Sequence, residues 1–153
     1  DDFLENDSLT YLKSFCEEAT IFFDVRDGYL GAYHFEGLMN PELEKLITEL
    51  RLLFPSLFGK RKLSQMWVYK YSDDGSRGIK THGDNAAVSI NIWLNPSNQE
   101  GLQGGGLKIW SDDVASDWAF HEMQGGDLEK HVSDSPSFII PFRQNRAVIF
   151  KSG

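Results

Sequence analysis

Cysteine is nearly absent from this chain: Cys16 stands alone, so no disulfide bond can form within the sequence. A disulfide framework of the kind found in small secreted proteins is therefore excluded. A single free thiol is typical of a protein in a reducing compartment, and we expect a cytoplasmic location.

Basic residues and long apolar runs are also scarce. Fifteen lysine and arginine residues stand against 23 aspartate and glutamate residues, which leaves a formal net charge of −8. Nucleic acids and anionic membrane surfaces attract basic proteins. No stretch approaches the run of about 18 to 20 apolar residues that a membrane-spanning helix needs. We therefore expect neither a nucleic acid nor a membrane as partner.

The composition that remains is that of a globular protein. Hydrophobic residues make up 41% and aromatic residues 13% of 153 residues, enough for one domain with its own core. The chain begins with Asp1 rather than methionine and stops soon after an apolar segment, so we expect it to be part of a longer protein.

Two helices are expected before residue 62. Apolar residues recur at helical spacing after Asp7 and Ser8, either of which can cap the first helix. The second helix has Asn40 as its N-cap and Pro41 at its first position, followed by a regular apolar stripe. Between the two helices, residues 21–25 predict a short strand.

The second half of the chain changes to short apolar strands separated by turns. Strands are predicted at residues 66–71, 86–94, 107–110, 138–142 and 147–151. Residues 72–78 and 95–106 have turn and loop compositions, and residues 111–126 are ambiguous, with a helix considered over residues 114–120. Helices first and strands after them predict an α+β fold with an antiparallel sheet or barrel.

The motif with the clearest chemistry is Thr81-His82-Gly83-Asp84. Side chains two residues apart on an extended backbone point to the same side, so the imidazole of His82 and the carboxylate of Asp84 can bind one metal ion. They would form two thirds of the 2-His-1-carboxylate triad of non-haem Fe(II) oxygenases. The alternative is a surface pair joined by a hydrogen bond at the start of a strand.

The surroundings of this motif carry a family resemblance. The matching segments are Tyr69-Lys70-Tyr71, Ile79-Lys80-Thr81-His82-Gly83-Asp84, residues 88–94, Gly104-Gly105-Gly106-Leu107 and Ala147-Val148-Ile149-Phe150. Together they resemble the double-stranded β-helix (jelly-roll) core of Fe(II)/2-oxoglutarate-dependent dioxygenases, in particular the prolyl-hydroxylase-like branch. The resemblance implies a single oxygenase-like domain over residues 1–153. Residues 63–153 would form the jelly-roll core, incomplete at its C-terminal end, and residues 1–62 a helical layer packed against it.

The resemblance also implies an activity. His82 and Asp84 would bind Fe(II), 2-oxoglutarate would be the co-substrate, and ascorbate is a candidate additional cofactor. The expected reaction is hydroxylation of a small molecule or peptide, with succinate and CO2 as co-products. The loops at residues 95–106 and 112–135 are long for ordinary connections and are expected to select the substrate.

The third metal ligand is missing from the sequence. In this branch the second histidine follows the strand that matches residues 147–150, so we expect it after Gly153. A substitute within the chain is His131 or His121, although both lie in polar surroundings typical of solvent-facing residues. A third explanation is a degenerate fold that holds no metal. His34 is expected to be a packed or surface residue.

Candidate contacts to 2-oxoglutarate come from the strands. The resemblance makes Tyr69 or Tyr71 a hydrogen-bond donor to the co-substrate, although aromatic residues on one strand face are more often core. Asn91 alternates with apolar residues and faces either solvent or the polar interior of the barrel. Arg146 is expected to be a solvated turn residue and is not assigned the role of carboxylate anchor.

Two further functions stay open on the sequence alone. One is a non-catalytic jelly-roll binding domain in which the His-x-Asp pair is vestigial. The other is a cupin-like metalloenzyme that does not use 2-oxoglutarate. A bound metal would distinguish the oxygenase from the binding domain. Succinate release that depends on 2-oxoglutarate would distinguish the oxygenase from the cupin-like metalloenzyme.

Overall fold

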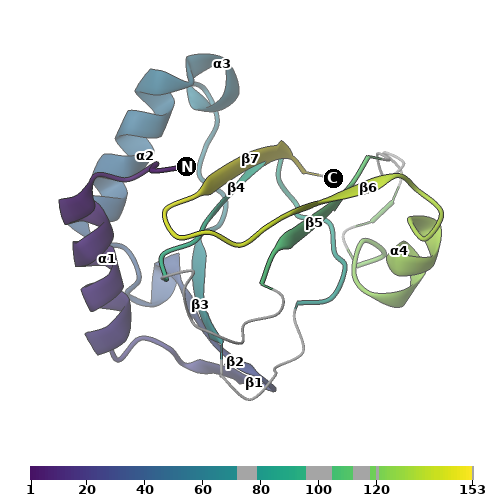
Figure 1. Ribbon diagram of the computed structural model, residues 1–153, viewed down its shortest axis with the longest axis horizontal. Helices are drawn as coiled ribbons and strands as arrows, with labels where there is room; N and C mark the ends of the chain where they lie inside the picture. The colour runs from purple at the N-terminus through teal and green to yellow at the C-terminus, as the bar shows by residue number, and fades with distance from the viewer. Residues whose placement is uncertain (72–78, 96–104, 112–117, 120, 153) are drawn as a thin grey trace. The chain divides into compact units, whose positions relative to one another are not determined.

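The computed structural model describes residues 1–71, 79–95, 105–111, 118–119 and 121–152 (Figure 1). The chain divides into two compact units. One is formed by Glu5–Gly78, and the other by Asp1–Leu4 together with Ile79–Gly153. Both contain helices and antiparallel strands, so the α+β class expected from the sequence is confirmed.

The helices of the Glu5–Gly78 unit are α1 (Asn6–Glu18), α2 (Pro41–Leu53) and α3 (Pro55–Phe58), with α1 and α2 side by side in Figure 1. The predicted cap of α2 is confirmed: the side-chain oxygen of Asn40 accepts hydrogen bonds from the backbone N–H groups of Glu42 and Leu43, both at 3.1 Å. The predicted cap of α1 is wrong. Its N-cap is Glu5, which makes no side-chain capping bond, and Ser8 lies within the first turn, where its hydroxyl donates to Glu42 at 2.5 Å.

A three-stranded antiparallel sheet completes this unit, in the order β1 (Asp24–Arg26), β2 (Tyr29–Tyr33) and β3 (Trp67–Tyr71). Strand β2 was not predicted, because Gly31 weakens the strand pattern in the sequence. Glycine leaves room there for the ring of Tyr69 on the neighbouring strand, which a Cβ atom would approach to 3.2 Å. The described part of the unit also holds a 3-10 turn, η1 (His34–Glu36).

This sheet alters the expected division of the chain. Residues 1–62 were expected to be a helical layer, but β1 and β2 lie within them. Strand β3, expected in the core after residue 63, pairs with β2 instead. The division between the two compact units falls between Gly78 and Ile79. Long-range pairing of β3 with β2 sets this boundary, and that pairing leaves no local signal in the sequence.

The described residues of the second unit form two antiparallel strand pairs and a short helix. Strand β4 (Val88–Ile92) pairs with β7 (Ala147–Lys151), β5 (Leu107–Trp110) pairs with β6 (Ser137–Ile140), and α4 is Gly126–His131. The predicted strands at 107–110 and 147–151 are confirmed to the residue. The strand predicted at 86–94 is shorter at both ends, and the one predicted at 138–142 begins one residue earlier and ends two residues earlier. Helix α4 was not predicted. The turn at 72–78 lies wholly outside the described residues, and the helix considered over residues 114–120 and the loop at 95–106 lie mostly outside them.

Buried apolar side chains occur in both units. In the Glu5–Gly78 unit these are Leu12, Ala32, Leu38 and Leu50, and in the second unit Leu4, Leu128 and Val132. Leu4 is held within the second unit by Asn145, whose side chain forms hydrogen bonds of 2.8 Å with both the N–H and the carbonyl of Leu4. Among the described helices, none has the length and apolar character to cross a membrane.

Candidate metal site

His82 and Asp84 face each other in the structure. The Nε2 atom of His82 lies 3.5 Å from the Oδ1 atom of Asp84. The side chain of Asp84 is largely buried, at 15% exposed, whereas that of His82 is 37% exposed. The two side chains are therefore within reach of each other, as both the metal site and its alternative, a surface pair joined by a hydrogen bond, require, and His82 is open to a ligand.

The hydrogen bonds of His82 set the role of each ring nitrogen. Nδ1 lies 2.7 Å from the carbonyl oxygen of Lys80, and since a carbonyl can only accept, Nδ1 carries the proton and donates. In the neutral imidazole Nε2 then holds a lone pair that can bind a metal, whereas in the protonated ring Nε2 carries a hydrogen and donates to Asp84. This arrangement is the usual one for a histidine that binds metal through Nε2.

The pair also shifts the protonation of both groups. The hydrogen bond to Asp84 raises the pKa of His82 above its usual value, with a smaller contribution in the same direction from the Lys80 carbonyl, although burial opposes both. The hydrogen bond from His82, followed by that from Ser89, lowers the pKa of Asp84 against the effect of its burial. Asp84 is therefore ionised at neutral pH, as a metal ligand must be.

A short backbone ladder holds the motif in place. The N–H of Gly83 donates to Met123 at 2.8 Å, the N–H of Gly125 donates to Thr81 at 3.0 Å, and the side chain of Gln124 donates to the Gly83 carbonyl at 2.9 Å. A Cβ atom on Gly83 would lie 3.2 Å from the Cβ of Met123, so glycine lets the two segments approach closely.

The polar side of Asp84 is built by β4 and β7, which run side by side in Figure 1. The Ser89 hydroxyl donates to the Oδ2 atom of Asp84 at 2.5 Å, and the Ser152 hydroxyl donates to Ser89 at 2.6 Å. Asn91 lies two residues beyond Ser89 and so on the same face of β4, opposite Val148. The polar residues Ser89 and Asn91 thus share one face of β4, and the contact of Asn91 with a co-substrate stays a prediction.

The distance between the two donors fits a shared metal ion. Two ligand atoms about 2.1 Å from one metal lie about 3.0 Å apart at a right angle and about 3.4 Å apart at a tetrahedral angle. The observed 3.5 Å separation of Nε2 and Oδ1 is within a small side-chain adjustment of these values. A nitrogen and a carboxylate oxygen are also the donor types that Fe(II), Mn(II) and Zn(II) accept.

The other histidines lie apart from this pair. His131 ends α4 and packs on Trp118, with ring centroids 4.9 Å apart. His121 is exposed in a turn, and His34 in the other unit accepts a hydrogen bond from the backbone of Met66 at 3.3 Å. In the ranges that the structure describes, no three histidine, cysteine, aspartate or glutamate side chains gather around a common point. His131 therefore does not complete the triad among these residues.

Tyr69 and Tyr71 lie on β3, in the Glu5–Gly78 unit. Their rings pack against Tyr29, with centroids 5.0 Å and 5.9 Å away. Burial raises the pKa of Tyr71 to about 12, with further contributions from the neighbouring tyrosines. The two tyrosines belong to an aromatic cluster of this sheet, and their predicted contact with 2-oxoglutarate stays a prediction.

Comparison with known proteins adds no relative: no protein-family model matches the chain, and neither a curated protein nor a solved structure shows significant similarity to it. The chemistry of the site therefore depends on its own geometry.

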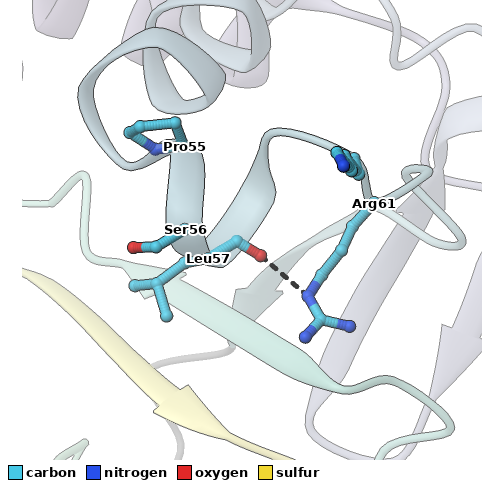
Figure 2. Close-up of a pocket in the computed structure, with 5 residues that line it drawn as sticks. Pro55, Ser56, Leu57 and Arg61 are labelled. Atoms are coloured by element: carbon cyan, nitrogen blue, oxygen red, sulfur yellow. Dashed lines mark hydrogen bonds between the residues drawn. The ribbon is translucent and has the colours of Figure 1, made fainter.

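A surface cavity of about 430 Å³ lies at α3 in the Glu5–Gly78 unit, lined by Pro55, Ser56, Leu57, Lys60 and Arg61 (Figure 2). Figure 2 shows the guanidinium of Arg61 turned back onto the helix, where Nε donates to the carbonyl of Leu57 at 2.8 Å. The lining residues include no carboxylate, histidine or cysteine, so this cavity offers no side chain typical of a metal site.

Three participants in the site were not predicted. Ser152 and Gln124 come from other segments and donate to Ser89 and to the Gly83 carbonyl, and the carbonyl of Lys80, two residues before His82, accepts from the imidazole ring. Ser89 alternates with apolar residues along β4, and this alternation is the signal that could have found it. Ser152 and Gln124 carry no local signal, because their roles depend on which distant segments meet.

Proposed function

We propose that the chain is the catalytic domain of an Fe(II)/2-oxoglutarate-dependent oxygenase that hydroxylates a small molecule or peptide. The observation that supports this proposal is the approach of His82 Nε2 to Asp84 Oδ1 at 3.5 Å, next to the β4–β7 pair. A jelly-roll core is part of the proposal, and the antiparallel pairs β4–β7 and β5–β6 are compatible with it.

His82 and Asp84 would hold the iron, and a histidine after Gly153 would be the third ligand. Ser152, directly after β7, is linked to Asp84 through Ser89, which supports a ligand position near this end of the strand. With 2-oxoglutarate bound, the iron supplies the oxidising power for hydroxylation, with succinate and CO2 as co-products. Ascorbate would keep the metal reduced.

The residues of this chain would orient the metal and tune its charge. Lys80 fixes the ring of His82, so that Nε2 is the binding atom, and Ser89 fixes the carboxylate of Asp84. A neutral imidazole and a single carboxylate leave a divalent ion with net positive charge, which favours binding of an anionic keto acid. Asn91, Tyr69 and Tyr71 are the residues that we propose for contacts to it.

The test measures metal content and 2-oxoglutarate turnover in the full-length protein. We expect one tightly bound Fe(II) and succinate release that depends on 2-oxoglutarate, and the loss of both in His82→Ala and Asp84→Ala. His121→Ala is the matched control, because it removes an exposed histidine outside the pair. It should retain full metal content.

Other results select the other functions. Metal bound through His82 and Asp84 without 2-oxoglutarate turnover would identify a metalloenzyme of the cupin-like kind. No bound metal in the full-length protein would overturn the proposal and leave a binding domain with a vestigial pair. The reducing cytoplasm that we propose as the location agrees with the free thiol of Cys16.

A further inference from the structure

We infer that Ser89 and Ser152 position the Asp84 carboxylate for metal binding, through two linked hydroxyl groups that leave one carboxylate oxygen facing His82. This inference rests on the proposed function, because the orientation of Asp84 matters to a metal only if His82 and Asp84 bind one. It adds two positioning residues that the His-x-Asp motif does not contain.

The hydrogen bonds of this hydroxyl relay run in one direction. A serine hydroxyl donates one proton and accepts through its lone pairs. Ser89 donates its proton to the Oδ2 atom of Asp84 at 2.5 Å, so its oxygen must accept the proton of Ser152 at 2.6 Å. A hydroxyl that donates to a carboxylate forms a charge-assisted bond, and an accepted hydrogen bond strengthens it further.

The sheet, rather than the loop that carries Asp84, places both hydroxyl groups. Ser89 lies opposite Phe150 in the β4–β7 register. Ser152 is two residues beyond Phe150 and therefore on the same face, beside Ser89. The backbone N–H of Ser152 donates to the carbonyl of Ala87 at 3.4 Å, which continues the pairing past the end of β7. The orientation of Asp84 is thereby tied to two paired strands.

The relay also separates the roles of the two carboxylate oxygens. Oδ2 is occupied by Ser89, whereas Oδ1 faces Nε2 of His82. A carboxylate without such a partner can bind a metal through both oxygens. With Oδ2 occupied, binding through Oδ1 alone is favoured, which leaves coordination positions free for other ligands. Loss of a hydrogen-bond partner to a metal ligand typically lowers metal affinity about 10- to 100-fold.

The experiment is a Co²⁺ titration of the full-length protein, followed by visible absorption. Ser89→Thr and Ser89→Val differ only in a hydroxyl, because both side chains are β-branched and of similar volume. We expect Ser89→Val to raise the Kd for Co²⁺ about 10- to 100-fold and to change the absorption bands, whereas Ser89→Thr stays close to the wild type. Ser152→Ala should cause a smaller loss.

A double variant tests the order of the relay. Ser152 acts on Asp84 only through Ser89, so Ser152→Ala should cause no further loss in the Ser89→Val background. The matched control is Ser111→Ala, which removes a hydroxyl that donates to the carbonyl of Pro136 at 3.0 Å in the same unit. It should leave the Co²⁺ affinity unchanged.

The outcomes separate this inference from the proposed function. Equal Co²⁺ affinities for Ser89→Thr and Ser89→Val, with binding still lost in His82→Ala, would overturn the relay and leave the metal site standing. Wild-type affinity in His82→Ala would overturn the metal site itself. If thermal melting shows that Ser89→Val does not fold, the comparison of Ser152→Ala with Ser152→Thr decides in its place, and equal affinities there overturn the inference.

Discussion

Asn145 joins two parts of the chain that are far apart in sequence. It is 6% exposed, and its side chain accepts a hydrogen bond from the N–H of Leu4 and donates one to the Leu4 carbonyl, both at 2.8 Å. Its backbone is left-handed, with a φ of 57°. Asparagine is one of the few residues other than glycine that tolerate this conformation. A single polar side chain can thus hold two distant segments of the chain together.

Replacement of this asparagine separates its two contributions. Asn145→Ala should destabilise the protein by about 2 to 4 kcal/mol, because it leaves the Leu4 groups unpaired and strains the backbone. Asn145→Gly loses the same hydrogen bonds, but glycine adopts the left-handed backbone conformation without strain. The glycine variant should therefore be about 1 kcal/mol more stable than the alanine variant. Urea unfolding measures both values, and equal stability of the two variants would contradict the role of the left-handed conformation.

Asp24 and Tyr33 give the stability a pH dependence at both ends of the scale. The Tyr33 hydroxyl donates to Asp24 at 2.7 Å. This hydrogen bond raises the pKa of Tyr33 well above its usual 10.0 and is the main cause of the lowered pKa of Asp24, against its usual 3.8. The stabilisation from Tyr33 is thus complete below about pH 10 and lost as the pH rises further, whereas that from Asp24 is present above about pH 4 and lost as the pH falls.

Tyr33→Phe removes the hydrogen bond between Tyr33 and Asp24 and tests the pH dependence of stability in both the acidic and the alkaline range. Wild type should exceed the variant in free energy of unfolding at neutral pH, and the difference should shrink below about pH 4 and above about pH 10. Urea titrations of both proteins across the pH range measure it. A difference that stays constant with pH would contradict the assignment.

Helix α2 shows the scale of secondary-structure elements. Its start is defined by chemistry within four residues: Asn40 caps the first turn, and Pro41 occupies the first helical position, where no N–H is needed. The N-cap of α1, Glu5, makes no side-chain capping bond. Helices α1 and α2 therefore depend on their N-cap residues to different degrees.

Asn40→Ala should lower the free energy of unfolding by about 1 kcal/mol, because two backbone N–H groups of α2 lose their acceptor. Glu5→Ala is the matched substitution at the other N-cap and should change it by less than about 0.5 kcal/mol. Thermal and urea unfolding of both variants measure the contrast. Equal losses would show that the cap of α2 contributes nothing specific.

At the scale of the whole molecule, the chain crosses between its two compact units twice. Residues Asp1–Leu4 belong with Ile79–Gly153, although they directly precede α1 of the other unit. Leu4 is buried at 8% exposed, and Leu12, only eight positions later, is buried at 4% in the other unit. Neighbouring residues in the sequence thus stabilise different units.

Leu4→Ala and Leu12→Ala should therefore act on different parts of the protein. Each should cost about 2 to 5 kcal/mol of local stability. Hydrogen exchange should increase in β4 and β7 for the first variant and in α1 and α2 for the second. Increases spread equally over both units in either variant would show that the units unfold as one.

Local patterns were sufficient for α2, for the strands at residues 107–110 and 147–151, for the α+β class and for the His82–Asp84 pair. Helix capping, strand alternation and i, i+2 geometry act between residues close in the chain, so the sequence alone expresses them. Helix α4 was missed because Gly125 and Gly126 weaken the helical pattern, and burial of Leu128 and Val132 outweighs that weakness.

Other features arise only when distant segments meet. The pairing of β3 with β2, the bonds of Asn145 to Leu4, and the link from Ser152 through Ser89 to Asp84 each join residues that no local pattern connects. The physical reason is that these contacts form as the backbone closes long loops and buries apolar surface. Their partners are then selected by the packing of the whole unit rather than by neighbours in the chain.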